Sequence, residues 1–483
     1  MDASGSSDEI AAPSAPRKAA PYLFWGQTTS LCEVCYALAP SKIIIEGDCV
    51  FYLKRCPDHG VQKTLVSDDA AYWKRCKEFI KPGDRPVKLS TRTEYGCPYD
   101  CGLCPDHEQH SCLAIIEIND ACNLTCPVCF AGSSTNRTEQ RSLSEVEKML
   151  DALVEAEGEP DLLQISGGEP TIHPDFFAIL DAAKARPIRH LMVNTNGVKI
   201  ARDPEFADRL ATYMPRFEIY LQFDSLRRGA LMELRGADLT SIRRQALDAL
   251  EKRNVSTTLV VTVKKGVNDD EIADIIRYAL EWSCVRGVTF QPIQDVGRNL
   301  DFDARRHRIV LSEIRKRAAA SGIFGLDDFI PLPCNPDQIS IAYGLHRGKT
   351  VVPVTSLIPR ELLVAEAPNT VAFENYPALR KRVFDLFSLP STAGDVSEKL
   401  ESILCCLPQV AAPQEMSYGS TFRVVISQFL DRFNFDLGGV KRSCVHFVHP
   451  DGKIYPFDTY NAFYRPGAPA RHIIEERRSD VRP

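Results

Sequence analysis

Short runs of apolar and β-branched residues alternate with longer amphipathic segments through the middle of the chain. The short runs, which predict buried β-strands, lie at residues 114–118, 162–165, 190–194, 218–223, 257–263 and 287–291. The longer segments repeat apolar residues every three or four positions and predict helices at 143–155, 241–253 and 270–282. Strands joined through helices form right-handed crossovers, so the pattern predicts a parallel α/β sheet. Such βα units make an open sheet or a partial barrel, and in either one ligands bind where the strands end.

A different pattern precedes these units. Residues 43–46 and 50–53 flank a Gly47-Asp48 turn, which predicts a β-hairpin, and a helical segment follows at 70–79. Residues 81–110 are rich in glycine and proline and show no strand or helix periodicity. Such a stretch needs something other than a hydrophobic core to order it.

The C-terminal region, from residue 306 onward, is interrupted by prolines and has a mixed pattern. Within it, Val425, Phe429 and Phe433 are spaced four apart, which predicts one face of a helix over 424–435. Such a face packs in a core or lines an apolar substrate groove, and the sequence leaves both open.

The overall composition is that of an ordinary globular protein. The chain has 483 residues, of which 44% are hydrophobic and 25% charged, and its net charge is −6. These values argue against collagen-like, disordered and strongly basic nucleic-acid-binding proteins. No run approaches the roughly 18 apolar residues of a membrane span, and the first residues offer no apolar stretch for a signal peptide. We therefore expect a cytoplasmic protein without a membrane span or a nucleic-acid partner.

Cysteine is the unusual component, with 17 in the chain and 12 of them before residue 130. The cytoplasm keeps thiols reduced, so clustered cysteines indicate metal ligands more than disulfides. The sharpest cluster is a Cys-x3-Cys-x2-Cys loop after the first predicted strand, formed by Cys122, Cys126 and Cys129. Three thiolates this close can hold one iron–sulfur cluster. A four-iron cluster needs four ligands, so three protein ligands leave one iron open to a substrate or cofactor.

Glycines and polar residues follow the next three predicted strands. Paired glycines let backbone polar groups approach a ligand closely, and parallel strands end at the same edge of a sheet. We therefore expect ligand-binding residues at this edge, namely Gly167, Gly168, Glu169, Pro170, Asn194, Asn196, Gln222 and Asp224.

The three-cysteine loop together with Gly167-Gly168-Glu169-Pro170 resembles the radical S-adenosylmethionine (radical SAM) superfamily. The resemblance implies a partial (βα)6 barrel, a [4Fe–4S] cluster on the loop cysteines, and S-adenosylmethionine at its open iron. It also implies that the ligand-binding residues expected at the strand ends bind this cofactor. Reductive cleavage then gives a 5′-deoxyadenosyl radical that takes hydrogen from an unactivated substrate carbon. A low-potential ferredoxin or flavodoxin is implied as electron donor. No catalytic residue is assigned, although Asp224, Asp327 and Lys264 are candidates for proton transfer.

Two further metal motifs precede the first predicted strand. A second Cys-x3-Cys-x2-Cys lacks a flanking strand and helix, so we assign Cys97, Cys101 and Cys104 to an auxiliary [4Fe–4S] cluster, with zinc as the alternative. Two knuckles joined by the predicted hairpin have the spacing of a zinc ribbon, with rubredoxin-like iron as the alternative, and consist of Cys32, Cys35, Cys56 and His59. The auxiliary cluster's fourth ligand is left open among Cys112, His107, His110 and Cys334. Burial and a further cluster are both left open for Cys405, Cys406 and Cys444.

The order of these motifs is similar to the group that contains archaeal tetraether lipid synthase, also described as a hydroxymethylpterin methylase. This resemblance implies C–C bond formation on lipid chains or methylation of a small substrate. Two departures weaken the first activity: residues 335–338 lack an expected cysteine, and Asp458 stands where a cysteine is expected. A third cluster is then missing or differently ligated.

Two other functions are kept as alternatives: a peptide-modifying radical SAM maturase with auxiliary clusters, and a non-enzymatic iron–sulfur electron carrier. We divide the chain into a disordered tail (1–20), a metal ribbon with a helix (21–80), an auxiliary iron–sulfur loop (81–112), the radical SAM partial barrel (113–305) and a C-terminal substrate or auxiliary region (306–483).

Overall fold

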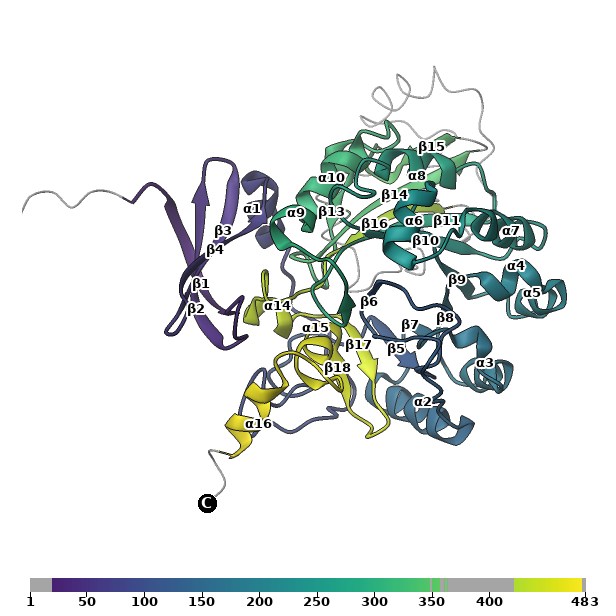
Figure 1. Cartoon of the computed structure of the whole chain (residues 1–483), viewed down its shortest axis with the longest axis horizontal. Helices are drawn as coiled ribbons and strands as arrows, with labels where there is room; N and C mark the ends of the chain where they lie inside the picture. The colour runs from purple at the N-terminus through teal and green to yellow at the C-terminus, as the bar shows by residue number, and fades with distance from the viewer. Residues whose placement is uncertain (1–19, 348–349, 357–359, 361–362, 364–420, 480–483) are drawn as a thin grey trace, which may run out of the picture.

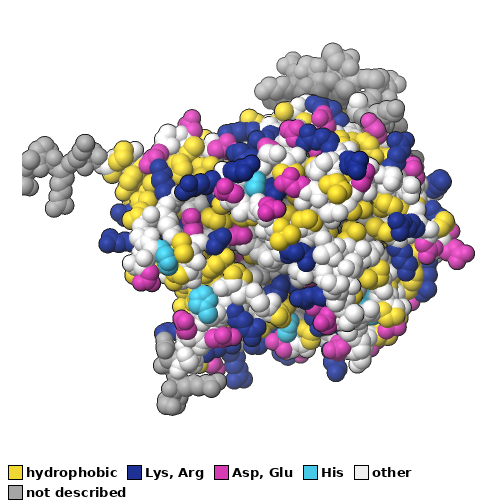
Figure 2. All heavy atoms as spheres, viewed as in Figure 1, with side chains coloured by type: hydrophobic (Ala, Val, Ile, Leu, Met, Phe, Trp, Pro, Cys, Tyr) yellow, Lys and Arg dark blue, Asp and Glu magenta, His cyan; other side chains and the backbone are white. Residues whose placement is uncertain are grey.

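The computed structural model describes residues 20–347, 350–356, 360, 363 and 421–479. The predicted tail lies outside this part except for its last residue, and Cys405 and Cys406 also lie outside it. Basic and acidic side chains are interspersed over the face shown in Figure 2. No helix within the described ranges is long and apolar enough to cross a bilayer.

The N-terminal part forms its own four-stranded antiparallel sheet (Figure 1). Its strands are β1 (Leu23–Leu31), β2 (Leu38–Glu46), β3 (Cys49–Cys56) and β4 (Gly60–Ser67). The predicted hairpin is the β2–β3 pair, which turns at Gly47 with a φ of 56°, a conformation that glycine adopts at little cost. Helix α1 (Ala70–Glu78) packs Trp73 against Ile45 and Val50. This sheet therefore has a small core of its own.

The six predicted strands form a curved parallel sheet at the centre of the molecule, in chain order. They are β5 (Leu113–Glu117), β7 (Leu162–Ser166), β8 (His190–Thr195), β9 (Phe217–Gln222), β10 (Thr257–Val263) and β11 (Val285–Pro292). The C-terminal region extends this sheet at both edges. Strand β16 (Thr421–Ser427) pairs parallel with β11, and β17 (Val445–Val448) pairs parallel with β5. The C-terminal region is therefore part of the central sheet.

The remaining strands are short or antiparallel additions. Beyond β16 and β17 the sheet continues with β13 (Ile330–Pro331), β14 (Ile339–Arg347), β15 (Thr350–Pro353) and β18 (Ile454–Pro456). A separate pair joins β6 (Val128–Cys129) to β12 (Arg298–Asn299), which brings residues after the last barrel strand against the three-cysteine loop.

The helices that connect the parallel strands cover the outer side of the curved sheet (Figure 1). Ser142 caps α2 in a capping box with Glu145, and Leu150 and Leu153 of α2 belong to the main core with Ile116. The helices after α1 are α2 (Leu143–Glu157), α3 (Phe176–Lys184), α4 (Val198–Arg202), α5 (Pro204–Ala211), α6 (Arg228–Arg235), α7 (Thr240–Glu251), α8 (Ile272–Ala279), α9 (Ala304–His307), α10 (Leu311–Ala319), α14 (Leu437–Lys441), α15 (Phe457–Thr459) and α16 (Arg471–Ser479). Single turns occur at η1 (Pro170–Ile172), η2 (Leu326–Asp328), η3 (Val354–Ser356) and η6 (Tyr460–Tyr464).

The predicted helix at 424–435 is wrong, because this segment begins within strand β16 and continues without a helix. Phe422, Val424 and Ile426 are fully buried while the residues between them are partly exposed, which is the period of two of a strand. The β-branched residues 424–426 favour the extended backbone over the helix. A spacing of four between a few apolar residues does not distinguish these structures in so short a segment.

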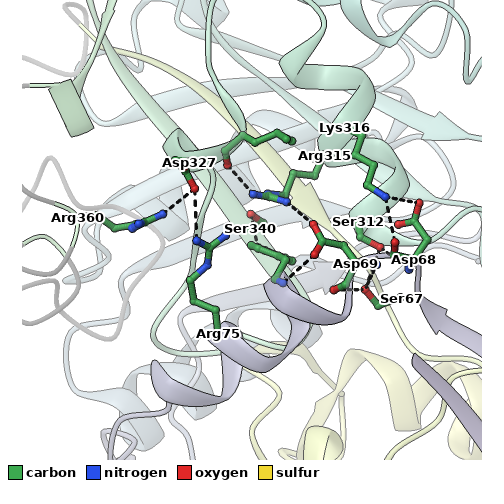
Figure 3. A network of polar contacts seen from close by, with 12 residues as sticks. Ser67, Asp68, Asp69, Arg75, Ser312, Arg315, Lys316, Asp327, Ser340 and Arg360 are labelled. Atoms are coloured by element: carbon green, nitrogen blue, oxygen red, sulfur yellow. Dashed lines mark hydrogen bonds and ion pairs between the residues drawn. The ribbon is translucent and has the colours of Figure 1, made fainter. Parts of the chain in front are cut away.

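A network of polar contacts joins the N-terminal sheet and α1 to α10 (Figure 3). Arg315 binds Asp69 at 3.0 Å, and Lys316 binds Asp68 at 2.8 Å. At the outer end of the network, Asp327 pairs with Arg75 and Arg360, and its side chain is 78% exposed. Asp327 was a candidate for proton transfer, but it lies in this surface network and does not line the cavity described below.

Candidate active site and metal centres

A cavity of about 230 Å³ runs along the inner face of the curved sheet. It extends from the beginnings of the strands, at Leu113 and Leu162, to their C-terminal ends. Aromatic residues from the C-terminal region, Phe429 and Phe457, close part of its wall. The cavity therefore occupies the place where α/β proteins of this topology bind their ligands.

The three-cysteine loop lies at this cavity. Cys122, Cys126 and Cys129 all line it, and Cys126 is the most buried of the three. Arg298 of β12 holds the loop by donating from Nε to the Cys126 carbonyl at 2.6 Å. Among the described residues, these cysteines are not one of the groups whose ligand atoms all lie within 4.8 Å of one another. Their sulfur atoms are therefore spread, which fits a cluster in which each cysteine binds a different iron.

Gly167 and Gly168 lie directly against the start of this loop. The Gly168 N–H donates to the Asn119 carbonyl at 2.8 Å. A Cβ atom at Gly168 would lie 2.2 Å from the Ala121 carbonyl oxygen, and one at Gly167 would lie 2.3 Å from Asn119 Oδ1. The two glycines are thus required for close packing on the loop, a reason that differs from the ligand approach expected from the sequence.

Glu169 ties the ends of two strands together. Its buried carboxylate accepts hydrogen bonds from the Asn196 N–H at 2.8 Å, from Thr195 Oγ1 at 2.7 Å and from Thr171 Oγ1 at 2.6 Å. Burial raises the pKa of this carboxyl group, and these donors oppose the rise. Pro170, which begins η1, is buried and does not line the cavity.

Amide side chains connect the ends of the next strands across the cavity wall. Asn194 Nδ2 donates to Ser166 Oγ at 3.1 Å, and Gln222 Nε2 donates to Asn194 Oδ1 at 2.7 Å. Asn196 reaches the three-cysteine loop, where its Nδ2 donates to Asn123 Oδ1 at 2.6 Å. Asn194, Asn196 and Gln222 all line the cavity.

Asp224 lies behind the cavity wall and positions an arginine. Its carboxylate is fully buried, accepts from Arg235 Nε at 2.6 Å, and is not among the residues that line the cavity. Arg235 does line the cavity and also donates to Gln222 Oε1 at 3.0 Å. At this strand end the residue that lines the cavity is therefore Arg235, whose guanidinium Asp224 orients, and a ligand contact of Asp224 itself stays a prediction.

Arg243 is the second cavity arginine that sequence reasoning missed. It is 2% exposed, its Nη1 donates to the Asn196 carbonyl, and its Nη2 lies 3.7 Å from Asp224 Oδ2. The Nε and Nη2 atoms have no hydrogen-bond partner. Burial lowers its pKa to about 10, so the guanidinium remains charged at neutral pH. A buried cation with two unused donors fits the carboxylate of an amino-acid cofactor. One sequence signal could have indicated that Arg243 is buried: it is three and four positions before Ala246 and Leu247, so it lies on the apolar face of the same helix.

The four ribbon residues form a compact group remote in sequence from the cavity. Their four ligand atoms all lie within 4.8 Å of one another. Cys35 Sγ is 3.8 Å from Cys56 Sγ, and His59 Nδ1 is 3.6 Å from Cys32 Sγ. Ligands about 2.0–2.3 Å from one tetrahedral ion lie about 3.5–3.8 Å apart, so this geometry fits a single zinc or iron ion.

The earlier Cys-x3-Cys-x2-Cys is packed under the C-terminal region. Cys101 and Cys104 are buried, and Cys101 Sγ donates to Thr459 Oγ1 at 2.8 Å. In the described chain this motif, like the loop at the cavity, does not form a tight ligand group. Two residues considered for its fourth ligand, Cys112 and Cys334, instead group with Cys444.

Comparisons with known proteins agree with this arrangement. Residues 116–279 match the model of the radical SAM superfamily, and residues 24–68 match that of the HMPTM N-terminal zinc ribbon domain. The chain thus contains a radical SAM domain built as a partial barrel, preceded by a zinc ribbon, and the predicted fold and superfamily are confirmed.

Among individual proteins, the chain is 28% identical to the 7,8-dihydro-6-hydroxymethylpterin dimethyltransferase of Methanocaldococcus jannaschii, over 91% of this chain and 94% of that protein. It is 27% identical to the GTP 3′,8-cyclase of Chlorobaculum tepidum, over 40% of this chain and 59% of that protein. The crystal structure of Streptococcus suis SuiB bound to S-adenosylmethionine matches with a TM-score of 0.38 and 16% identity, over 44% of this chain and 47% of that chain.

Proposed function

We propose that this radical SAM enzyme binds a [4Fe–4S] cluster through Cys122, Cys126 and Cys129 and uses it to activate S-adenosylmethionine in the cavity. When bound, these groups supply a 5′-deoxyadenosyl radical that abstracts hydrogen from an unactivated substrate carbon. The observation that carries the proposal is that the spread three-cysteine loop and the buried Arg243, whose Nε and Nη2 atoms have no hydrogen-bond partner, line one cavity.

The strand ends and helix α7 contribute different residues to cofactor binding. Arg243 binds the cofactor carboxylate through Nε and Nη2, because a charge-assisted pair satisfies both unused donors. Asn194 and Gln222 present amide groups to the cofactor, and Asn196 joins this wall to the loop through Asn123. Asp224 acts through Arg235.

Gly167, Gly168, Glu169 and Pro170 form the segment beside the loop. Their backbone is proposed to face the cofactor's amino end, because Gly167, Gly168 and Glu169 line the cavity next to Cys122. The Glu169 carboxylate keeps the segment in place, since its oxygens accept hydrogen bonds from the neighbouring strand end. Aromatic side chains close part of the cavity wall, which limits access of water to reactive species.

We propose methylation of a small, pterin-like heterocycle as the reaction. This rests on the similarity to a pterin dimethyltransferase, which extends over 94% of that relative, whereas the similarity to the GTP 3′,8-cyclase covers 59% of that protein. The second candidate is C–C bond formation on lipid chains, which the aromatic and apolar wall at Phe130, Phe429 and Phe457 favours. The maturase alternative rests on matches to about two fifths of the chain, such as 41% for a mycofactocin maturase.

The remaining metal sites complete the proposed enzyme. The auxiliary [4Fe–4S] cluster is proposed on Cys97, Cys101 and Cys104, and one zinc or iron ion on Cys32, Cys35, Cys56 and His59. A low-potential ferredoxin or flavodoxin is the proposed electron donor, and the cytoplasm the proposed location.

Anaerobic reconstitution tests the chemistry. The wild-type protein with S-adenosylmethionine and a strong reductant is expected to release 5′-deoxyadenosine, and Cys126→Ala to release none, because the cluster loses one of three ligands. The matched control is Cys284→Ala, a buried cysteine that immediately precedes β11 and does not line the cavity. Equal release by Cys126→Ala and wild type would refute the proposal. Adding a hydroxymethylpterin and following mass increases of one methyl group distinguishes methylation from lipid coupling.

A further inference from the structure

Three cysteines from distant parts of the chain meet beside the edge of the barrel. Cys112 immediately precedes β5, Cys334 lies between β13 and β14, and Cys444 immediately precedes β17. Their side chains are at most 1% exposed. The three sulfur atoms all lie within 4.8 Å of one another, and those of Cys334 and Cys444 are 3.2 Å apart. The tertiary fold creates this group, since no short cysteine motif joins its members.

A histidine stands at the edge of this group. His110 Nε2 is 3.4 Å from Cys112 Sγ. The other ring nitrogen, Nδ1, is 3.1 Å from Glu157 Oε2. Glu157 is the last residue of α2, and its second oxygen accepts from the Ser111 N–H at 2.9 Å, which fixes the carboxylate. A histidine that faces sulfur with one nitrogen and a fixed carboxylate with the other has the arrangement of a metal-binding histidine with its orienting carboxylate.

The two other nearby histidines are arranged differently. His107 Nε2 and His446 Nε2 face each other at 3.1 Å. His107 Nε2 is also 2.9 Å from the Ser443 carbonyl oxygen. His110 is therefore the nearby histidine that directs a ring nitrogen at a sulfur of the group.

We propose that Cys112, Cys334, Cys444 and His110 bind one tetrahedral metal ion, zinc or ferrous iron, with Glu157 orienting His110. Ligand atoms about 2.0–2.3 Å from one ion lie about 3.5–3.8 Å apart, and the Cys334–Cys444 and Cys112–His110 distances of 3.2 and 3.4 Å are slightly shorter. His110 is not within 4.8 Å of all three sulfur atoms, so binding the ion requires its ring to move toward Cys334 and Cys444. A cubane cluster spaces its thiolates more widely because each binds a different iron. Among the described residues, the three cysteines here and the four ligands of the ribbon form tight groups, and neither Cys-x3-Cys-x2-Cys motif does.

Such an ion would fasten the C-terminal region to the barrel. The Leu113 N–H donates to the Cys444 carbonyl at 3.1 Å, exactly where β17 begins to pair with β5. Strand β17 leads through β18 to α15, whose Phe457 lines the cavity. Loss of the ion is therefore expected to loosen this wall of the cavity as well as to lower stability.

Metal and sulfide analysis of the full-length protein, purified anaerobically, tests the proposal. Cys444→Ala and His110→Ala are each expected to lose one metal ion per chain with unchanged acid-labile sulfide, because a single-ion site holds no sulfide. His110→Cys is expected to retain the ion, since a thiolate replaces the imidazole. The control, Cys76→Ala, removes a buried cysteine that belongs to neither tight group.

Two outcomes would overturn the proposal. Unchanged metal content in Cys444→Ala and His110→Ala would mean that the thiols are ordinary core residues, and a joint loss of several irons with sulfide would mean a cluster. The Glu157→Gln variant provides a second test in case Cys444→Ala and His110→Ala do not fold. It is expected to fold and to keep the ion, but to lose it to a chelator about 10–100 times more readily than wild type. Equal chelator resistance of Glu157→Gln and wild type would refute the orienting role.

Discussion

The three-cysteine loop at the cavity and the ribbon use similar residues to build sites of opposite kinds. In the ribbon, four ligand atoms lie within 4.8 Å of one another, so one ion would have every position filled by protein. At the cavity, three spread cysteines line an interior space of about 230 Å³, which is also lined by Arg243, a buried arginine with two nitrogen atoms that have no hydrogen-bond partner. A closed tetrahedral site suits a structural ion, whereas a site with a missing ligand suits chemistry on a bound molecule. The ribbon and the cavity site therefore differ in the number of protein ligands and in whether the ligands border a cavity.

Replacing Arg243 by glutamine is expected to have the largest effect on the cavity site. The change removes the charge that we propose for the cofactor carboxylate. A hydrogen bond to a charged group contributes about 1.5–3 kcal/mol, so the dissociation constant of S-adenosylmethionine should rise about 10–100-fold. Isothermal titration under anaerobic conditions measures it. Arg244→Gln, on the exposed face of the same helix, is the control, and equal affinities in the two variants would contradict the role of Arg243.

Alanine at position 168 should have the next largest effect. Its Cβ would lie 2.2 Å from the backbone oxygen of Ala121, so the three-cysteine loop or the strand end must shift. Overpacking of this kind costs about 1–3 kcal/mol, and 5′-deoxyadenosine release should fall with it. Gly229→Ala is the matched control, because a Cβ there meets no atom within 4 Å. Equal decreases in melting temperature for Gly168→Ala and Gly229→Ala would argue against close packing as the reason for glycine at position 168.

The Cys56→Ala substitution removes a proposed ribbon ligand and should have the smallest effect on the activity at the cavity. We expect loss of the ribbon ion and a lower melting temperature, because a structural metal contributes to folding. The rate of S-adenosylmethionine cleavage per folded molecule should stay within about twofold of wild type, because the ribbon and the cavity share no residues and substitutions at separate sites have independent effects. Cys49→Ala, in the same strand but outside the metal group, should keep the ion. A large loss of cleavage in Cys56→Ala alone would show that the ribbon and cavity are coupled.

The local chemistry was largely predictable, because it depends on short spacings. The six parallel strands and the superfamily followed from apolar runs and from the residues after them. The helix expected at 424–435 was wrong because three apolar residues spaced by four fit more than one structure, and the pairing of β16 with β11 and β14 favours the strand.

Side-chain roles were less predictable than motif positions. Asp224 was expected at a ligand, yet it lies behind Arg235, which comes from the following helix. Arg243 gave only a weak signal, a charged residue on the buried face of α7. Which polar group reaches the cavity depends on helix packing, and a motif does not contain that information.

By itself, the sequence determined that this protein is an α/β protein with several metal motifs and a radical SAM loop, because three cysteines within eight residues can reach a common cluster without help from the rest of the fold. Only the tertiary structure decided that strands from the C-terminal region complete both edges of the sheet, and that Cys112, Cys334 and Cys444 meet. The physical reason is distance along the chain: residues that are far apart in sequence are brought together by strand pairing and core burial, which no local pattern encodes.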